Sequence, residues 1–439
     1  APFIAHASTA LKKSITFATQ LKTEMMKLKI IVPALLGAIA LTLTFGACGK
    51  GKSGDKQNKP AAVPKDIAVD QQLRTRLEGF AEGMKLRGVF GFQVYDITAN
   101  KPVYGYHEHR TQPSASCLKL LTGVAGLHFL GTHYNYRTAI FTKGRQVGDT
   151  LQGDVSFKAD LDPMLQPDDL DMFVQALRRK GIQNIAGKLI FDLVLTDPVT
   201  SEAHWYPWDL SFSHYGLLYK GEAKVKQALQ QSLRHAGITV SDEQMVVAKT
   251  PTGSHCLFRF YRSIDRVIQR MWKNSSNTQA TSLLYTIGHY YDPKQAPAEA
   301  GLAYLRHFMR KNLQLKDTAL VIHDGCGLCT QNQLSPDALV IILRYGYAHP
   351  AIYEQLQRNL SIAGVDGTLH SLLRSDKLKG KIHGKTGTLS HPYGISSLAG
   401  YATGSNGHLL AFAIMDHQMS VLDARVLQRE LCTVLVEKP

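Results

Sequence analysis

The stretch Lys381-Ile-His-Gly-Lys-Thr-Gly-Thr-Leu389 opens a C-terminal region in which strand-like segments follow one another closely. Two further segments, 395–403 and 408–415, continue this region and are separated by a glycine-rich turn. Near the other end of the chain, 89–96 and 103–107 are expected to form a hairpin. Strands at both ends around a helical middle indicate an α+β fold, in which N- and C-terminal segments build one antiparallel sheet flanked by helices.

The spacing of apolar residues predicts the helices between these strands. Helical periodicity runs through 71–86, through 116–130 and through 263–272. A further helix is expected to open at Pro297, because proline suits the first helical position. A closing helix runs to Val436. The segments therefore alternate in a way that fits helices packed against a sheet.

The N-terminal segment has the pattern of a bacterial lipoprotein signal peptide. Residues 1–25 precede a natural start at Met26, after which basic residues lead into an apolar run, 30–45. The run ends in Gly-Ala-Cys48, which resembles a lipobox, so Cys48 is expected to be lipidated. We therefore expect a protein of the bacterial cell envelope, in the periplasm and lipid-anchored to a membrane. The alternative is an uncleaved anchor helix, since about 18 residues can span a bilayer.

The composition fits a folded protein and excludes several classes. Of 439 residues, 44% are hydrophobic and 19% charged, which argues against wholesale disorder, a collagen-like chain or a coiled coil. Eight of the fifteen excess positive charges lie in the first 65 residues. No basic run interleaved with aromatic residues is present, so no nucleic-acid partner is expected.

The chain divides into four expected parts. A mixture of short strands, a helix and aromatic loops interrupts the main domain and is interpreted as an insertion. The parts are an upstream extension with the signal peptide at 1–47, a tether at 48–65, a main domain made of 66–138 and 262–439, and an inserted accessory domain at 139–261.

Three short motifs follow one another along the chain: Ser116-Cys-Leu-Lys119, Ser275-Ser-Asn277 and Lys385-Thr-Gly387. Residues three apart on a helix share a face, so Lys119 Nζ can reach Ser116 Oγ. A serine hydroxyl becomes a good nucleophile only when a base takes its proton. A lysine that is desolvated near another cation can have its pKa lowered enough to serve, and Lys385 is the natural second cation.

The remaining motif residues suit the handling of a peptide. Ser275 could relay a proton to a leaving amine, and Asn277 could hold a peptide amide. Gly387 lacks a side chain and would let a substrate backbone approach its strand. Together the three motifs predict a Ser/Lys acyl-transfer site that works without histidine.

The three motifs are those of penicillin-binding proteins and serine β-lactamases. Longer blocks, over about residues 89–415, narrow the resemblance to the D-Ala-D-Ala carboxypeptidase/endopeptidase family of low-molecular-mass class C penicillin-binding proteins, the S13 peptidases. The blocks are Ser114-Ala-Ser-Cys-Leu-Lys-Leu-Leu-Thr122, Asp324-Gly-Cys-Gly-Leu328 with 332–336, Ala363-Gly-Val-Asp-Gly-Thr-Leu369 and Gly384-Lys-Thr-Gly-Thr-Leu389.

The resemblance implies a penicillin-recognising, transpeptidase-like domain with a shortened insertion. It implies hydrolysis of peptidoglycan stem peptides through a serine acyl-enzyme, inhibition by β-lactams, and no cofactor or metal. In the roles that the resemblance implies, Ser116 is the nucleophile, Lys119 the base and Ser275 the proton relay. Asn277 is the substrate clamp, and Lys385, Thr386 and Thr388, around Gly387, bind the substrate carboxylate. The backbone N–H groups of Ser116 and Thr388 form the oxyanion hole.

The sequence departs from the family pattern at several positions. Ser114 stands where the family usually has proline, Ser276 where it has aspartate and Thr281 where it has glutamate. The departures at Ser276, Thr281 and Cys326 leave open a non-catalytic module that recognises cell-wall peptide. A second alternative is a serine β-lactamase, which would need a further base to position a deacylating water. Cys326 and Cys329 also differ from the pattern and could be structural thiols, a local disulfide, a redox pair or half of a zinc site.

Overall fold

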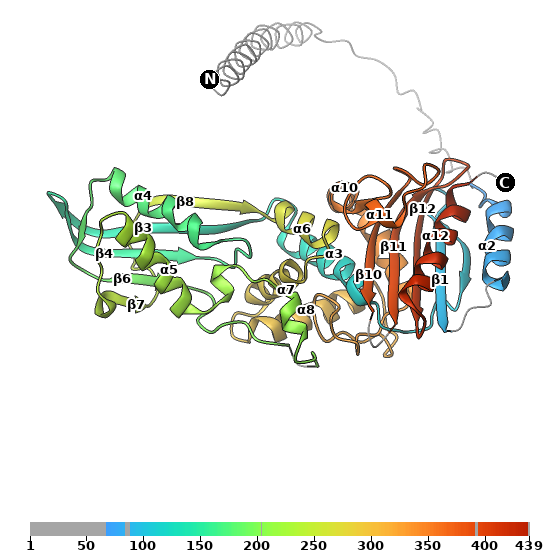
Figure 1. Cartoon of the computed structure of the whole chain (residues 1–439), viewed down its shortest axis with the longest axis horizontal. Coiled ribbons are helices and arrows are strands. Elements are labelled where there is room, and N and C mark those ends of the chain that lie inside the picture. Colours follow the sequence, from blue (N-terminus) through green and yellow to red (C-terminus); the bar gives the residue numbers. More distant parts are fainter. Residues whose placement is uncertain (1–66, 84–87, 203, 391–393, 438–439) are drawn as a thin grey trace, which may run out of the picture. The chain divides into compact units, whose positions relative to one another are not determined.

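The computed structural model describes residues 67–83, 88–202, 204–390 and 394–437 (Figure 1). The predicted signal peptide, the tether and the lipidation of Cys48 lie outside these residues. Within the described ranges, no helix combines the length and the apolar character that crossing a membrane requires.

The first sheet joins the two ends of the described chain. Its six strands lie in the order β2-β1-β12-β11-β10-β9, and every neighbouring pair is antiparallel. The register pairs Phe92 of β1 with Ile414 of β12, so the predicted union of N- and C-terminal segments is confirmed. The strands are β1 (Val89–Asp96), β2 (Lys101–Tyr106), β9 (Ser361–Ile362), β10 (Ile382–Leu389), β11 (Ile395–Thr403) and β12 (Leu409–His417).

Helices cover both faces of this sheet. Because side chains alternate along a strand, Phe412 of β12 packs with α2 and α12, whereas Ala413 packs into the core around α3 and α9. Figure 1 shows α2 and α12 on the same side of the sheet. The helices of this part are α2 (Gln71–Gly83), α3 (Leu118–Leu130), α6 (Ile264–Lys273), α7 (Asn277–Tyr291), α8 (Pro297–Lys311), α9 (Pro336–Ala348), α10 (Pro350–Asn359), α11 (Leu369–Leu372) and α12 (Val421–Val436).

A second sheet has its own core and takes its strands from residues 135–263. Its order is β7-β6-β4-β3-β8, and β5 pairs with β4. The range overlaps the insertion that was predicted for 139–261. Its elements are β3 (Asn135–Val147), β4 (Thr150–Ala159), α4 (Asp171–Arg179), β5 (Asn184–Ile185), β6 (Leu189–Asp192), α5 (Glu222–His235), β7 (Met245–Val247) and β8 (His255–Ser263).

One edge of β10 is largely open. On that side β10 pairs with β9 only at His383 and Gly384, so in the described chain residues 385–389 have no neighbouring strand there. The other edge pairs with β11 along its whole length. The part of β10 that carries the third motif can therefore accept an extended peptide alongside it.

Candidate active site

Ser116 lies in a tight turn that leads into α3. The turn, Ala115–Cys117, is a 3-10 helix, so the α-helix begins two residues later than the sequence predicted. The physical reason is a contact with the sheet: Ser397 Oγ of β11 donates to Ser114 O at 2.6 Å, and Cys117 N–H donates to the same carbonyl at 3.2 Å. Ala115 adopts a φ of 43° in this turn, and Ser116 remains half-buried.

The side-chain amine of Lys119 lies beside Ser116, as the i, i+3 spacing predicted. Lys119 Nζ is 2.7 Å from Ser116 Oγ, 2.8 Å from Asn277 Oδ1 and 2.6 Å from the backbone oxygen of Cys326. The side chain of Lys119 is 0% exposed. All three hydrogen bonds of the Lys119 amine are thus to oxygen atoms. They bring the first motif, at Ser116, into contact with the second, at Asn277.

Burial sets the charge of both lysines. It lowers the pKa of Lys119, an effect that the negative charge of Asp324 partly opposes. Burial, reinforced by the charge of Lys119, lowers the pKa of Lys385 to about 7. Near neutral pH the site therefore disfavours the state in which both lysines carry a charge.

The second motif lies in the turn between α6 and α7. Ser275 has a φ of 56°, in the left-handed region that non-glycine residues seldom adopt, and this aims its hydroxyl at the third motif. Lys385 Nζ donates to Ser275 Oγ at 2.8 Å. Asn277 begins α7 and donates its amide N–H to the backbone oxygen of Phe212 in the inserted segment at 3.3 Å.

The third motif lies on β10, close against the nucleophile turn. A Cβ atom at Gly387 would fall 2.7 Å from Ser114 O and 2.9 Å from Ser116 N, so only glycine fits without displacing the turn. The side chain of Thr386 donates to Thr368 Oγ1 at 2.8 Å. The structure thus brings together all three motifs that the sequence singled out.

The loop that follows Asp324 supports the base, through a main-chain contact to Lys119 that was not predicted from the sequence. The carboxylate of Asp324 accepts the N–H groups of Gly327 at 2.7 Å and Cys329 at 2.8 Å, and also Trp205 Nε1 of the inserted segment at 2.8 Å. These bonds fix the loop so that the carbonyl of Cys326 faces Lys119. A backbone carbonyl has no sequence signature; only the 324–328 block marked this loop as noteworthy.

The cysteines of this region are buried free thiols. Burial raises the pKa of the Cys326 thiol and raises the pKa of Cys329 to about 11, so both are protonated at neutral pH. Cys117 donates its S–H to Lys385 O at 3.0 Å and packs in the core. No cluster of three or more side chains suited to hold a metal occurs in the part of the chain that the structure describes.

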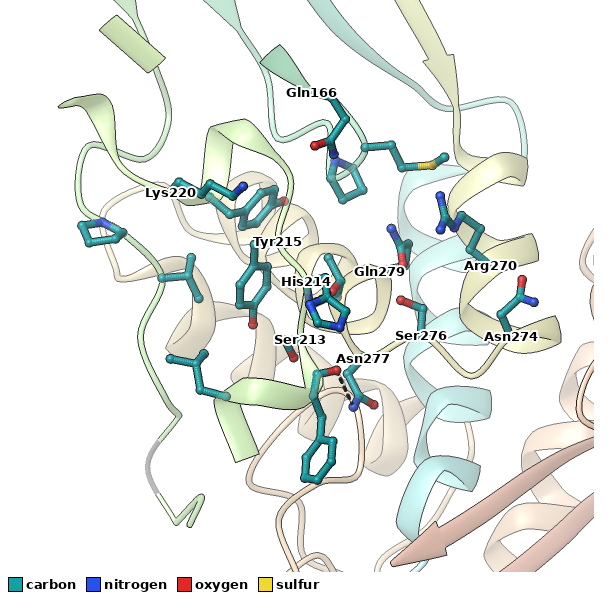
Figure 2. Close-up of a pocket in the computed structure, with 18 of the residues that line it drawn as sticks. Gln166, Ser213, His214, Tyr215, Lys220, Arg270, Asn274, Ser276, Asn277 and Gln279 are labelled. Carbon is teal, nitrogen blue, oxygen red and sulfur yellow. Dashed lines mark hydrogen bonds between the residues drawn. The ribbon is translucent and has the colours of Figure 1, made fainter. Parts of the chain in front are cut away.

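Two hollows meet at Ser275. The first, about 560 Å³, contains Ser116 together with Thr386 and Thr388 and extends to α12. The second, about 1080 Å³, lies on the other side of the second motif, and residues of the inserted segment form much of its wall (Figure 2). The nucleophile and two of the three expected carboxylate-binding residues, Thr386 and Thr388, thus share one hollow.

The arrangement of these motifs on this fold defines a serine peptidase of the penicillin-recognising kind. The chain belongs to the D-Ala-D-Ala carboxypeptidase 3 (S13) family, whose model matches residues 73–216 and 218–437. The family inferred from the motifs and the predicted α+β transpeptidase-like fold are therefore confirmed.

Individual relatives agree with this membership. The chain is 21% identical to the D-alanyl-D-alanine carboxypeptidase DacB of Haemophilus influenzae over 406 residues, which cover 73% of this chain and 84% of the relative. The crystal structure of penicillin binding protein 4 from the same organism matches with a TM-score of 0.69 and 20% identity, over 82% of this chain and 99% of that one. A predatory peptidoglycan endopeptidase from Bdellovibrio bacteriovorus matches with a TM-score of 0.55 and 16% identity, over 79% and 92%.

Proposed function

We propose that this chain is a serine-type D-Ala-D-Ala carboxypeptidase that cleaves peptidoglycan stem peptides through an acyl-enzyme on Ser116. The observation that carries the proposal is the buried Lys119 amine, 2.7 Å from Ser116 Oγ. A neutral lysine amine has two N–H donors and one lone pair. The two donors match Asn277 Oδ1 and the Cys326 carbonyl, which leaves the lone pair for the Ser116 proton.

Acylation follows from this geometry. Lys119 takes the hydroxyl proton as Ser116 Oγ attacks the carbonyl carbon of the penultimate D-Ala. The negative charge that develops on the carbonyl oxygen is stabilised by the backbone N–H groups of Ser116 and Thr388, because the close approach of Gly387 to Ser116 N sets β10 beside the nucleophile. Such donors are each worth on the order of 10²-fold in rate.

The second pair of residues serves the leaving group. As the C–N bond breaks, Ser275 donates its proton to the departing amine and is resupplied by Lys385, with which it is hydrogen-bonded at 2.8 Å. Lys385, Thr386 and Thr388 hold the carboxylate of the departing D-Ala. The proton that Lys119 took from Ser116 is then released to solvent, and Lys385 regains a proton. A water molecule deprotonated by Lys119 attacks the ester carbonyl, and Lys119 returns that proton to Ser116 Oγ as the acid leaves.

The departures from the family pattern leave these contacts intact. Ser276 makes no side-chain hydrogen bond that caps α7, and Thr281 is buried in α7. Within the described chain no hydrogen bond joins either residue to Ser116. This favours a peptidase over a non-catalytic module. Among the described residues, no carboxylate is hydrogen-bonded to Ser116 or Lys119, so the second base that a β-lactamase needs is not apparent.

A fluorescent penicillin and a peptide ending in D-Ala-D-Ala test the proposal together. The wild type should form a stable covalent adduct and release D-Ala, and Ser116→Ala should do neither. Ser53→Ala is the matched control, because Ser53-Gly-Asp-Lys56 repeats the SxxK spacing in the tether. Absence of labelling would indicate a binding module, and rapid turnover of penicillin would indicate a β-lactamase.

We also propose that Cys48 is lipidated and anchors the protein to a membrane of the envelope, with 139–261 as an accessory domain inserted into the catalytic domain of 66–138 and 262–439. The Gly-Ala-Cys48 sequence and the polar tether support the anchor. Mass spectrometry of the N-terminal peptide should find a diacylglyceryl group on Cys48. Cys48→Ala should leave the membrane fraction, whereas Cys256→Ala should stay in it.

A further inference from the structure

The inserted segment contains a loop, residues 205–212, that exposes two large aromatic side chains. Trp208 is 53% exposed and Phe212 is 57% exposed, and no other tryptophan or phenylalanine of the described chain is exposed. Scattered apolar residues are common on protein surfaces, whereas two exposed rings in one short loop form a patch of the kind that contacts other molecules. The reaction described above uses neither ring.

This loop is fastened to the active site at both of its ends. Trp205 Nε1 donates to the Asp324 carboxylate at 2.8 Å, and Asn277 Nδ2 donates to Phe212 O at 3.3 Å (Figure 2). Between these two bonds the chain forms a 3-10 turn, Asp209–Phe212. The loop is therefore held in place beside the second motif, although its aromatic rings are exposed.

Trp208 stacks on Tyr206, and the pair adjoins a third hollow. The two ring centroids are 5.0 Å apart, with an angle of 10° between the ring planes. Tyr206 lines a hollow of about 470 Å³, which is also lined by Pro113, three residues before Ser116. This hollow shares no lining residue with the two hollows that meet at Ser275, so it is a separate site.

The lining of the third hollow is rich in hydrogen-bonding groups and carries no negative charge. Among the described residues, no aspartate or glutamate lines it. Amide, hydroxyl and guanidinium groups are supplied by Arg110, Thr111, Gln112, Thr330, Gln333 and Gln418. A flat aromatic surface next to such groups suits a ligand that has apolar faces and a polar edge.

A pyranose sugar has both of these features. The C–H groups on the faces of its ring carry a small positive partial charge and pack against the negative face of an aromatic ring. The hydroxyl and acetamido groups around its edge donate and accept hydrogen bonds. A lipid chain has no polar edge, and a compact ion would not use the rings. The volume of the third hollow lies within the usual range for ligand pockets.

The position of the loop indicates which sugar it meets. Each stem peptide of peptidoglycan is attached at its N-terminal end to a glycan strand. In the proposed reaction the leaving residue lies with the carboxylate-binding threonines, so the rest of the peptide extends from Ser116 in the opposite direction, past Asn277. Asn277 is hydrogen-bonded to the loop at Phe212. The end of the peptide that carries the glycan is therefore directed toward residues 205–212.

We propose that Trp208, Tyr206 and the third hollow form a binding site for the glycan strand of peptidoglycan, a β-1,4-linked chain of N-acetylated sugars. Trp208 supplies the surface on which a sugar ring stacks, and the hollow takes the polar edge of the strand. The inference rests on the proposed function, because its ligand is the polymer that carries the stem peptide. The inserted segment then holds the polymer while Ser116 acts on one of its peptides.

A β-1,4-linked tetrasaccharide of N-acetylglucosamine tests the site without catalysis. Calorimetry should show that the wild type binds it and that Trp208→Ala raises the dissociation constant about tenfold, because the stacking surface is lost. Trp208→Phe keeps an aromatic ring and should restore most of the affinity. Gln333→Ala removes one amide from the hollow but keeps the main-chain bonds to Val321, and it should weaken binding about threefold.

The matched control is Tyr261→Ala. Tyr261 is also 53% exposed, lies on β8 of the inserted segment and lines none of the three hollows. Its replacement should leave the affinity for the tetrasaccharide unchanged. The proposal would be overturned if the wild type did not bind the tetrasaccharide, or if Tyr261→Ala and Trp208→Ala weakened binding equally.

Release of D-Ala from two substrates separates this site from the reaction itself. With a soluble peptide that ends in D-Ala-D-Ala and carries no sugar, Trp208→Ala should match the wild type. With intact peptidoglycan below saturation, Trp208→Ala should release D-Ala at least fivefold more slowly.

The outcomes distinguish the two proposals. Failure of the wild type to release D-Ala from the soluble peptide would refute the proposed function. Equal rates for the wild type and Trp208→Ala on peptidoglycan would refute the glycan site. If Trp208→Ala kept its affinity for the tetrasaccharide but no longer sedimented with anionic phospholipid vesicles that bind the wild type, the rings would contact a membrane, and the glycan site would again be refuted.

Discussion

Replacing Lys119 by Met separates the base from the fold. Methionine keeps an unbranched side chain of similar length at a site with no exposed surface, but it has no amine. Loss of a general base costs about 10²-fold to 10⁴-fold in rate, or about 3 to 5 kcal/mol of activation free energy. We therefore expect acylation by a fluorescent penicillin to slow by at least a hundredfold.

The same substitution has a smaller effect on stability. Asn277 Oδ1 and the Cys326 carbonyl lose their donor, and unsatisfied buried groups cost about 1–3 kcal/mol. A domain stabilised by about 5–15 kcal/mol should stay folded. Thermal unfolding followed by circular dichroism should show a lowered but cooperative transition for Lys119→Met.

Thr122→Val is the control for loosening of the supporting loop. Thr122 Oγ1 donates to the carbonyl of Gly325 at 2.6 Å, one turn further along α3, without contacting Ser116. It should lower the unfolding temperature and leave acylation within about threefold of wild type. If Lys119→Met were acylated within tenfold of the wild-type rate, the assignment of Lys119 as base would be wrong.

Three further predictions concern pH and packing. The pKa of Lys385 is lowered to about 7, so its positive charge is lost as pH rises through that value. The kcat/KM for a D-Ala-D-Ala peptide should therefore fall above about pH 7. A flat profile of kcat/KM from pH 6 to 9 would contradict this prediction. Gly387→Ala should slow penicillin acylation at least tenfold, because the added Cβ would collide with the turn that holds Ser116. Gly79→Ala is the control and should be acylated like the wild type, because no atom lies within 4 Å of a Cβ at that position. Burial raises the pKa of Asp416 to about 8, so between about pH 4 and pH 8 the folded state holds a proton that the unfolded state has lost, and the stability of the protein should fall as pH rises through this range. In thermal unfolding, Asp416→Asn should flatten this pH dependence. An unchanged slope would exclude Asp416 as its source.

Local patterns predicted the elements well where a strand or helix is bounded by its own sequence. The segment expected at 395–403 has the bounds of β11, because a glycine-rich turn follows it. The helix expected from residue 116 begins at Leu118 instead. The bond from Ser397 to Ser114 that shapes this turn joins residues 283 apart in sequence, so no local pattern could show it.

The same limit applies to the active site. The sequence spacing alone predicted that Lys119 lies beside Ser116, because residues three apart lie about one helical turn from each other. The partners contributed by main-chain carbonyls, Cys326 to Lys119 and Phe212 to Asn277, escaped notice because any residue type can supply them. Motifs thus predict which side chains react, and the fold decides which main-chain atoms hold them in place.

The main-chain contact from position 326 to Lys119 has a consequence for tolerance to mutation. Exchanging the side chain at this position would leave the oxygen that meets the amine in place, so the cysteine found there need not impair the base. Gly327, the next residue, cannot be replaced in the same way, because a Cβ atom at this position would lie 1.9 Å from Ala115 O. Because Cys326 is buried in the core, a saturation library selected for penicillin labelling should retain variants with small side chains at 326 and none at 327.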